Sequence, residues 1–427
     1  MRIAVIGSGI AGLGCARALN GSCDLTVYEA EPRLGGHTNT IDVALDGASF
    51  AVDTGFLVYN ERTYPGLIRL FAELGVPVAK SDMSFGVSIA AGGRRIEWAG
   101  SSLGTAFAQP RNLISPRFIS MLADIVRFNA RATRLATGGG SIGPMSLGSF
   151  LEHDRYGEPF RNWYLLPMAA AIWSCPIETM LDYPIATFAR FCHNHGLLQL
   201  TRRPQWYTVR GGARQYVEKI AAGLDDVRVN EPVQEVRSDT SSGRVRVRSA
   251  SGTENFDHVV LACHSDQSLK LLSDADDAQR SLLAAIGYQP NRAWVHTDQA
   301  LMPAERKVWS AWNYMSDGAA RPAVSVTYWL NRLQPLPFQT PIFLSLNPPV
   351  EPARSAQIIT IDYAHPVFDA AAVSAQQRLD SVQSRRGVWF AGAWTGYGFH
   401  EDGLASGMKV AASIRDQLAC ATPARAA

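Results

Sequence analysis

The sequence predicts an α/β fold built on a parallel sheet, and three observations support this prediction. An apolar run at residues 3–6 ends in a glycine-rich segment, and a helix-compatible stretch follows as far as Leu19. A second apolar run, residues 25–28, ends at an acidic residue, and a third lies within residues 256–261. Short continuous apolar runs are typical of strands that are buried on both faces, as in parallel sheets.

The composition is that of a folded chain without a bias toward nucleic acid. Of the 427 residues, 47% are apolar and 18% are charged, which excludes a disordered chain and leaves room for two or three domains. The 40 basic and 38 acidic residues leave a net charge of +2, too small to predict a nucleic-acid partner. Only five residues are lysines, so few candidates exist for a mechanism that needs one.

Cysteine usage and hydropathy predict a cytoplasmic protein. No run of 18 apolar residues is present, so no segment is expected to span a bilayer. Residues 1–6 lead directly into the glycine-rich segment, which leaves no room for a signal peptide. The cysteines form no CxxC pair and are expected to be reduced thiols; they are Cys15, Cys23, Cys175, Cys192, Cys263 and Cys420.

The glycine-rich segment carries a GxGxxG fingerprint between the first strand and the first helix. Gly7 permits a tight turn, Gly9 lets the backbone approach a pyrophosphate, and Gly12 lets the helix pack closely on the strand. Glu29, 22 residues after Gly7, is placed to accept a hydrogen bond from a ribose hydroxyl. The fingerprint predicts a dinucleotide site but does not distinguish NAD from FAD. The predicted contact residues are Gly7, Gly9, Ile10, Ala11, Gly12 and Glu29.

A second glycine pair follows the strand that ends at Glu29. Adjacent glycines offer backbone N–H groups to a bulky anionic ligand, and Arg33 adds a positive charge nearby. The same pair would also fit an ordinary loop. The candidate cofactor contacts in this segment are Ala30, Arg33, Gly35 and Gly36.

Together these segments resemble the flavin amine oxidase superfamily, which also holds phytoene-desaturase-like and protoporphyrinogen-oxidase-like enzymes. The resemblance extends over nearly the whole chain, and besides the fingerprint it is carried by residues 33–36, 53–56, 209–212, 232–236, 257–262, 388–395 and 403–407. It implies an FAD cofactor. No cysteine or histidine lies at a position that can be assigned to a covalent link, so the FAD is expected to be bound non-covalently. Residues 392–403 resemble a bacterial subgroup associated with the modification of fatty acyl chains.

The resemblance implies a discontinuous Rossmann-like FAD-binding domain with an inserted mixed α+β substrate domain. The expected FAD-binding ranges are 1–80, 203–268 and 380–420. The expected substrate-domain ranges are 81–202 and 269–379, and residues 421–427 are expected to fray. Residues 244–249 alternate as a strand should, and residues 408–418 predict a helix that starts near Gly403.

The resemblance also implies FAD contacts near the end of the chain. They are Val233, Gly392, Ala393, Trp394, Thr395, Gly403 and Leu404. His400 is the candidate catalytic residue, because its charge changes near neutral pH and it would lie near the flavin ring. The alternative is a structural role for this cluster, in which Glu401 and Asp402 cap the final helix.

Two further patterns bear on the chemistry. Many amine oxidases of the superfamily place a lysine near flavin N5, whereas the corresponding segment here, residues 288–295, contains none. His193 and His195 form an HxH pair, expected on one side of a strand, but no third ligand has a recognisable spacing. No metal site is therefore predicted, and the pair is expected to line the substrate cavity or to stabilise a loop.

Aromatic residues in the substrate region predict a large apolar cavity, although such residues are more often plain core. They are Trp163, Tyr164, Trp173, Trp309, Trp312, Tyr314, Tyr328 and Trp329, with Met168 and Met315.

Residues 109–137 have the pattern of an amphipathic helix with five arginines and a single acid. One hypothesis is contact with an anionic membrane, at its inner face; the other is a core-facing helix with a solvated basic side. The arginines are Arg111, Arg117, Arg127, Arg131 and Arg134, and the apolar positions are Phe118, Met121, Leu122, Ile125 and Phe128.

The leading functional prediction is an FAD-dependent oxidoreductase that transfers hydride from a lipophilic substrate to flavin N5, the substrate being a fatty acyl chain of membrane phospholipid. Two alternatives stay open. One is oxidation of an amine to an imine with release of hydrogen peroxide. The other is a flavin-binding, membrane-associated partner protein without turnover.

Overall fold

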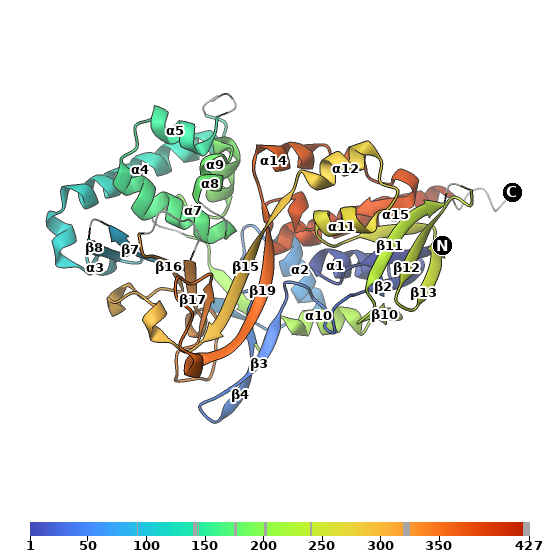
Figure 1. The fold of residues 1–427 in the computed structure, drawn as a ribbon, viewed down its shortest axis with the longest axis horizontal. Helices are drawn as coiled ribbons and strands as arrows, with labels where there is room; N and C mark the ends of the chain where they lie inside the picture. The colour runs from blue at the N-terminus through green and yellow to red at the C-terminus, as the bar shows by residue number, and fades with distance from the viewer. Residues whose placement is uncertain are drawn as a thin grey trace.

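The computed structural model describes residues 1–421 except 92, 140–142, 144, 175–176, 200–202, 240 and 319–324, with the side chains of 420 and 421 also left out. Figure 1 shows two halves: a parallel sheet with its helices on the right, and a larger sheet beneath a group of helices on the left. Both termini lie in the right-hand half.

The parallel sheet brings together strands from three distant parts of the chain. Its order is β10-β2-β1-β14-β20, and every neighbouring pair is parallel. The strands are β1 (Arg2–Ile6), β2 (Asp24–Tyr28), β10 (Asp226–Arg228), β14 (His258–Leu261) and β20 (Val388–Phe390). The α/β fold class and the Rossmann-like arrangement predicted from the sequence are thus confirmed.

Each face of this sheet packs on a different layer, because successive side chains of a strand point to opposite faces. Ile3 and Val5 of β1 pack on α1 (Ile10–Leu19) and α15 (His400–Ala421). Ala4 and Ile6 pack on the opposite layer. That layer contains the antiparallel sheet β11 (Val233–Asp239), β12 (Arg244–Ser249) and β13 (Gly252–Phe256), together with α11 (Ser265–Leu271), α12 (Asp277–Ala284) and α14 (Ala370–Gln377).

The second half contains a mixed sheet of seven strands, ordered β19-β15-β18-β17-β16-β7-β8. The long antiparallel pair β15 and β19 reaches from this sheet toward the parallel sheet, with Gly287 opposite Val367 at one end and His296 opposite Gln357 at the other. The strands are β7 (Phe85–Ala91), β8 (Arg94–Ala99), β15 (Gly287–His296), β16 (Trp312–Ser316), β17 (Ser325–Trp329), β18 (Phe343–Leu346) and β19 (Gln357–Val367).

Helices cover the upper left of the molecule (Figure 1). They are α3 (Leu103–Ala106), α4 (Pro116–Ala136), α5 (Leu147–His153), α6 (Glu158–Phe160), α7 (Leu166–Trp173), α8 (Ile177–Leu181) and α9 (Ile185–Asn194). Their inward-facing residues belong to one large hydrophobic core, which also includes residues of the seven-stranded sheet and of α1.

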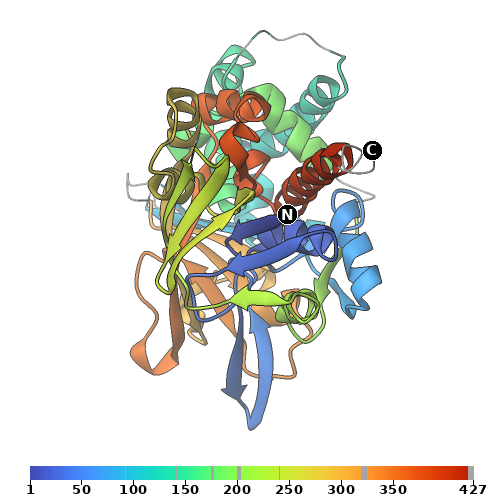
Figure 2. The ribbon, with the colours of Figure 1, turned by 90° about the vertical axis from the view of Figure 1, so that its right-hand side faces the viewer.

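Several smaller elements lie outside these sheets. The hairpin of β3 (Thr40–Leu45) and β4 (Ala48–Asp53) projects from the body in both views (Figures 1 and 2). The remaining elements are β5 (Tyr59–Asn60), β6 (Val78–Ser81), β9 (Trp206–Val209), α2 (Pro65–Leu74), α10 (Arg214–Ala221) and α13 (Leu330–Leu333).

Several local predictions can be compared with these elements. The strand at 244–249 is confirmed as β12, and the predicted final helix is α15, which begins three residues before Gly403. The HxH pair does not lie on a strand: His193 is in the last turn of α9 and His195 is its C-terminal cap. Residues 272–286 and 372–375, inside the range expected for the substrate domain, pack against the parallel sheet. Within the described residues, no helix is long and apolar enough to cross a membrane.

Candidate functional site

The glycine fingerprint forms a tight turn between β1 and α1. Gly7 has φ +102°, in the region that favours glycine. A Cβ on Gly12 would lie 1.9 Å from the carbonyl oxygen of Gly7, so only glycine permits this approach of helix and strand. At Gly9, the N-cap of α1, no side chain caps the helix and no acid lies in its first turn. The first N–H groups of α1 are therefore available to an anion.

The acid at the end of β2 faces this turn. The Glu29 carboxylate accepts hydrogen bonds from the backbone N–H of Ser8 at 3.0 Å and from its hydroxyl at 2.5 Å. It also accepts one from the N–H of Glu31 at 3.0 Å. These contacts hold the carboxylate at the mouth of the fingerprint, where its role toward a ribose stays a prediction.

The second glycine pair lies directly against the first. Gly35 donates its N–H to the carbonyl of Ser8 at 3.1 Å. A Cβ on Gly36, which has φ +56°, would stand 3.3 Å from the Cα of Gly9. The Arg33 guanidinium donates to the Gly36 carbonyl at 2.8 Å, while Ala30 is exposed beside it. The two glycine segments predicted separately therefore form one backbone cradle.

The C-terminal segment closes onto the start of α1. Leu404 packs against Gly14, and a Cβ on Gly403 would meet the side chain of Ile10 at 2.8 Å. Trp394 is buried and donates its indole N–H to the carbonyl of Cys263, just beyond β14, at 3.2 Å. This segment includes the short 3₁₀ turn Ala393–Thr395, which follows Gly392.

Val233 joins this neighbourhood through the backbone. It begins β11, and the N–H of Glu231 just before it donates to the carbonyl of Glu29 at 2.9 Å. The structure thus brings all of the predicted FAD contacts to the carboxyl edge of the parallel sheet around β1. Their individual roles toward FAD stay predictions.

His400 begins α15 and contacts Thr38, two residues after the second glycine pair. Its Nε2 is 3.0 Å from the Thr38 hydroxyl and 2.8 Å from the Tyr216 hydroxyl. Its ring stacks on Phe56 with the centroids 3.9 Å apart. Desolvation by these surroundings lowers the pKa of His400 to about 3, so the ring is neutral at physiological pH.

The two acids after His400 do different work. Glu401 accepts hydrogen bonds from the N–H groups of Gly66 at 2.7 Å and Leu67 at 2.9 Å, so it caps α2 rather than its own helix. Asp402 accepts from the N–H of Phe399 at 2.9 Å, and burial raises its pKa to about 6. The predicted helix-capping role is correct for Asp402 and wrong for Glu401, because the fold places α2 within reach of its carboxylate.

A pocket of about 370 Å³ opens beside His400. Its lining residues are Arg62, Thr63, Tyr64, Pro65, Asn194, His195, Tyr397, Phe399, Glu401 and Asp402. His195 is buried and donates a hydrogen bond from its Nδ1 to the Phe191 carbonyl at 3.0 Å, and burial lowers its pKa to about 4. Among the described residues, no group of three or more His, Cys, Asp or Glu side chains is arranged so that it could hold a metal ion.

A cluster of three histidines was missed by sequence reasoning. His37 follows Gly36, His264 follows β14, and His365 lies on β19. The His37 ring is 5.9 Å from that of His264 and 5.4 Å from that of His365. Burial and the neighbouring histidines hold the pKa of His37 well below its usual range. For His37 and His264 the sequence signal was their position just after a glycine pair and a strand end, where ligands of α/β sheets bind. His365 lies within β19 and had no such signal.

This edge of the sheet fits a dinucleotide that carries a further ring system. The uncapped start of α1 and the open space at Gly9 suit a pyrophosphate. The Nε2 atom of His37 is buried and has no hydrogen-bond partner among the described residues, as expected for a group that awaits a polar ligand. A family model described as flavin containing amine oxidoreductase matches residues 10–329, more than half of the chain.

The chain belongs to the flavin-containing amine oxidoreductase family. It is an FAD-dependent oxidoreductase, as the sequence resemblance implied, and non-covalent binding of the FAD stays a prediction.

Solved structures with the same fold cover nearly the whole chain. Cyclohexylamine oxidase from Brevibacterium oxydans is 16% identical, with 98% of this chain and 99% of that one covered and a TM-score of 0.70. A CLA-producing fatty acid isomerase from P. acnes is 16% identical over 96% and 98% of the two chains, with a TM-score of 0.68. Putrescine oxidase is 15% identical over 97% and 99%, with a TM-score of 0.68. A comparison with curated protein sequences finds no match.

The lysines of this flavoenzyme lie at the surface. All five are exposed: Lys80, Lys219, Lys270, Lys307 and Lys409. The strand expected to carry a flavin-facing lysine is β15, where Asn291 and His296 are the buried polar residues instead. The amide nitrogen of Asn291 is 3.0 Å from Nδ1 of His365.

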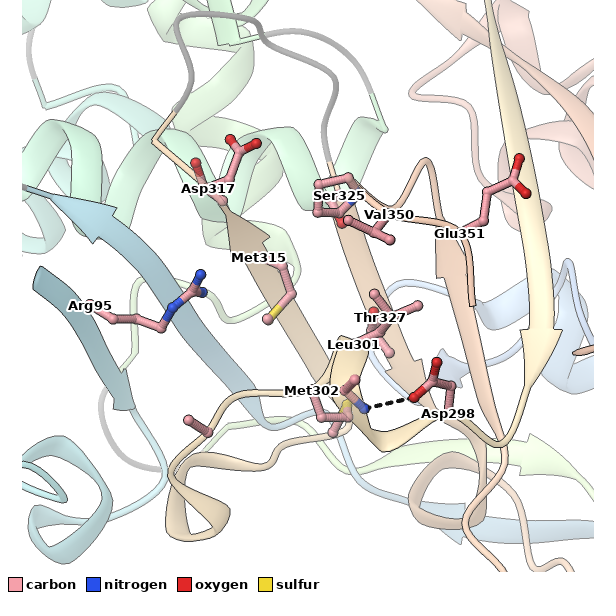
Figure 3. Close-up of a pocket in the computed structure, with 14 residues that line it drawn as sticks. Arg95, Asp298, Leu301, Met302, Met315, Asp317, Ser325, Thr327, Val350 and Glu351 are labelled. Carbon is pink, nitrogen blue, oxygen red and sulfur yellow. Dashed lines mark hydrogen bonds between the residues drawn. The ribbon is translucent and has the colours of Figure 1, made fainter. Parts of the chain in front are cut away.

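The aromatic residues expected to line an apolar cavity mostly pack on one another. The ring centroids of Trp312 and Tyr328 are 4.7 Å apart, and those of Trp309 and Trp329 are 5.5 Å apart. Met315 does line a pocket, of about 510 Å³, that lies on the seven-stranded sheet. Figure 3 shows Arg95 and Glu351 on opposite sides of this pocket. None of the predicted FAD contacts lines it, so it is separate from the candidate site.

Proposed function

We propose that this flavoenzyme dehydrogenates a lipophilic substrate, an unsaturated fatty acyl chain of membrane phospholipid. The observation that carries the proposal is that aromatic rings surround the candidate site, whereas all five lysines are exposed at the surface. Phe56 stacks on His400, and Phe399 stacks on Phe191 with the centroids 5.2 Å apart. Phe191 also packs on Trp173, with the ring centroids 4.5 Å apart. Such walls suit an alkyl chain better than a polar amine.

The proposed reaction forms a second carbon–carbon double bond. One C–H hydrogen leaves the chain as hydride, and a neighbouring C–H loses a proton. An existing double bond next to the reacting carbon delocalises the charge that develops there. What bound FAD supplies is the two-electron oxidant, and dioxygen or another electron acceptor takes up the two electrons afterwards.

The residues of this chain would bind and orient the alkyl chain rather than attack it. His400 is neutral and shares its Nε2 with two hydroxyls, so it is suited to fixing Thr38 and Tyr216 beside the substrate. The rings around it keep water from the reacting carbon. Asp402, with a pKa of about 6, is the nearby group best matched to receiving a proton near neutral pH.

Amine oxidation is a second candidate, favoured by Glu401 and Asp402 in the pocket wall. Carboxylates attract an ammonium group, and two of the structural neighbours are amine oxidases by name. The lysine positions speak against it.

The deciding experiment follows the visible flavin spectrum of the purified holoenzyme without oxygen. Vesicles with unsaturated acyl chains should bleach the flavin, and matched vesicles with saturated chains should not. Mass spectrometry of the reacted lipid should show the loss of two hydrogens. Bleaching by cyclohexylamine or putrescine, with no response to either vesicle, would establish the amine candidate instead. A flavin that no substrate reduces would return the non-catalytic alternative.

A further inference from the structure

Four aliphatic side chains point into solvent at one end of the molecule. Leu103 is 79% exposed, Leu113 57%, Ile114 85% and Ile119 45%. They belong to α3, to the 3₁₀ turn Pro110–Ile114 and to the first turns of α4. Scattered exposed aliphatic residues are ordinary, but four within 17 residues form a patch that favours binding. We call these four residues the apolar tip.

The fold holds the apolar tip in place without burying it. Phe118, between two of its members, is buried and packs on Phe107 with the centroids 5.7 Å apart. Asn112 is buried beside the backbone of β8. Ser115 caps α4 by accepting from the N–H of Phe118 at 3.3 Å. Inward residues therefore anchor the segment, and its outward aliphatic residues contribute nothing to the core.

The surroundings of the apolar tip are basic. No acidic residue occurs between residues 98 and 123, a stretch that includes Arg111 and Arg117. The turn Arg306–Val308 packs on α3 and adds exposed Arg306 and Lys307. Of the nearest acids, Glu97 is buried and accepts N–H groups of residues 304 and 305, and Glu158 pairs with Arg117. Glu305, which precedes the turn, is partly exposed and offsets one of its two positive charges.

Two of the arginines farther along α4 are already paired with acidic side chains. Arg127 pairs with Asp124 at 2.9 Å and stacks over Tyr156 at 4.1 Å. Arg131 pairs with Asp154 at 3.3 Å. The apolar side of the helix predicted for residues 109–137 faces the core. Four of its residues are buried: Phe118, Met121, Ile125 and Phe128. A membrane contact through that side of the helix is excluded by packing.

We propose that the apolar tip inserts into the surface of an anionic phospholipid bilayer, with Arg111, Arg306 and Lys307 contacting the headgroups. Aliphatic side chains inside a basic rim match the two layers of such a surface, hydrocarbon beneath anionic phosphate. A second copy fits less well, because an isologous contact would bring the two basic rims together. The tip lies at the end of the molecule opposite the parallel sheet (Figure 1).

This inference rests on the proposed function only in naming the surface from which an acyl chain would be taken. Binding is therefore measured without turnover, by co-sedimentation of the full-length holoenzyme with vesicles. Vesicles of phosphatidylcholine with phosphatidylglycerol should pellet the protein, and pure phosphatidylcholine should pellet much less. The double variant L113S/I114S should bind the anionic vesicles at least about tenfold more weakly. The matched control is V350S, an exposed β-branched residue elsewhere that is 69% exposed.

A charge variant separates insertion from simple adhesion. R111Q/K307Q should weaken binding about fivefold or more at low salt and lose most of its difference from the wild type at high salt. Equal binding of L113S/I114S and the wild type would overturn the proposal. So would concentration-dependent dimers that the double variant abolishes, without vesicle binding, since the occupant would then be a second copy. Vesicle binding without flavin reduction would uphold the tip and reject the lipid substrate.

Discussion

His400 illustrates how surroundings change what a residue type predicts. A histidine at the start of a helix beside a flavin would ordinarily titrate near neutral pH and serve as a base. Here the Phe56 ring and the hydroxyls of Thr38 and Tyr216 surround it, and its pKa falls to about 3. We therefore assign it a positioning role rather than proton transfer.

Replacing His400 by alanine should cost about 2–4 kcal/mol of unfolding free energy, because two hydrogen bonds and a stacked ring are lost. It should also lower FAD content, while the pH profile of flavin reduction between pH 5 and 8 keeps its shape. Urea unfolding and stopped-flow reduction provide the two readouts. The control is His153→Ala, at a side chain that is 68% exposed. Loss of one limb of the pH profile in His400→Ala would make His400 the base.

At the scale of elements, α15 fastens two other helices near the site. A Cβ on Gly407 would lie 2.0 Å from the carbonyl of Ala11, so α15 and α1 touch backbone to backbone. Glu401, nearly two turns earlier, caps α2 with two hydrogen bonds. The N-cap residue of α2 itself, Tyr64, provides no side-chain hydrogen bond. Glu401 thus replaces a local cap with a long-range one.

Glu401→Gln should lower the unfolding free energy by about 1–2 kcal/mol, the usual worth of a lost helix cap. An amide keeps one acceptor oxygen but loses the negative charge that favours a helix N-terminus. Denaturant unfolding measures the change. Glu152→Gln, whose side chain is 72% exposed, should stay within about 0.5 kcal/mol of the wild type. An equally small effect of Glu401→Gln would show that the cap is not stabilising.

At the scale of the whole molecule, buried carboxyls set part of the pH dependence of stability. Burial raises the pKa of Asp53 and of Asp402 to about 6. In the unfolded chain an aspartate has a pKa of about 3.9. Between these values the folded state binds more protons than the unfolded state, so these two groups lower stability as pH rises from about 4 to about 6.

Asp402→Asn removes one of these groups and keeps an acceptor for the N–H of Phe399. The quantity to compare is the unfolding free energy of the variant minus that of the wild type. This difference should be about 2 kcal/mol more favourable to the variant at pH 7.5 than at pH 4.5. Unfolding curves at both pH values test this. Asp380→Asn, at a carboxyl that is 74% exposed, is the comparison and should show much less. A pH-independent difference for Asp402→Asn would contradict the assignment.

Residue patterns that act locally could be predicted from the sequence. The turn at Gly7, the helix that follows Gly9 and the strand at 244–249 follow from short-range sterics and alternation. Predictions that depended on distant partners were less secure. The HxH pair was expected on a strand, and its place at the end of α9 follows from core packing of Phe188 and Phe191.

For this chain, sequence alone identified the α/β class, the dinucleotide fingerprint and the flavoenzyme family, because each is read from short motifs of a few consecutive residues, even where those motifs are spread along the chain. Tertiary structure was needed to bring His37, His264 and His365 together, to turn Glu401 toward α2 and to leave the apolar tip uncovered. These features join residues that are tens to hundreds of positions apart. Whether such side chains meet is decided by the packing of sheets and helices, which local patterns do not encode.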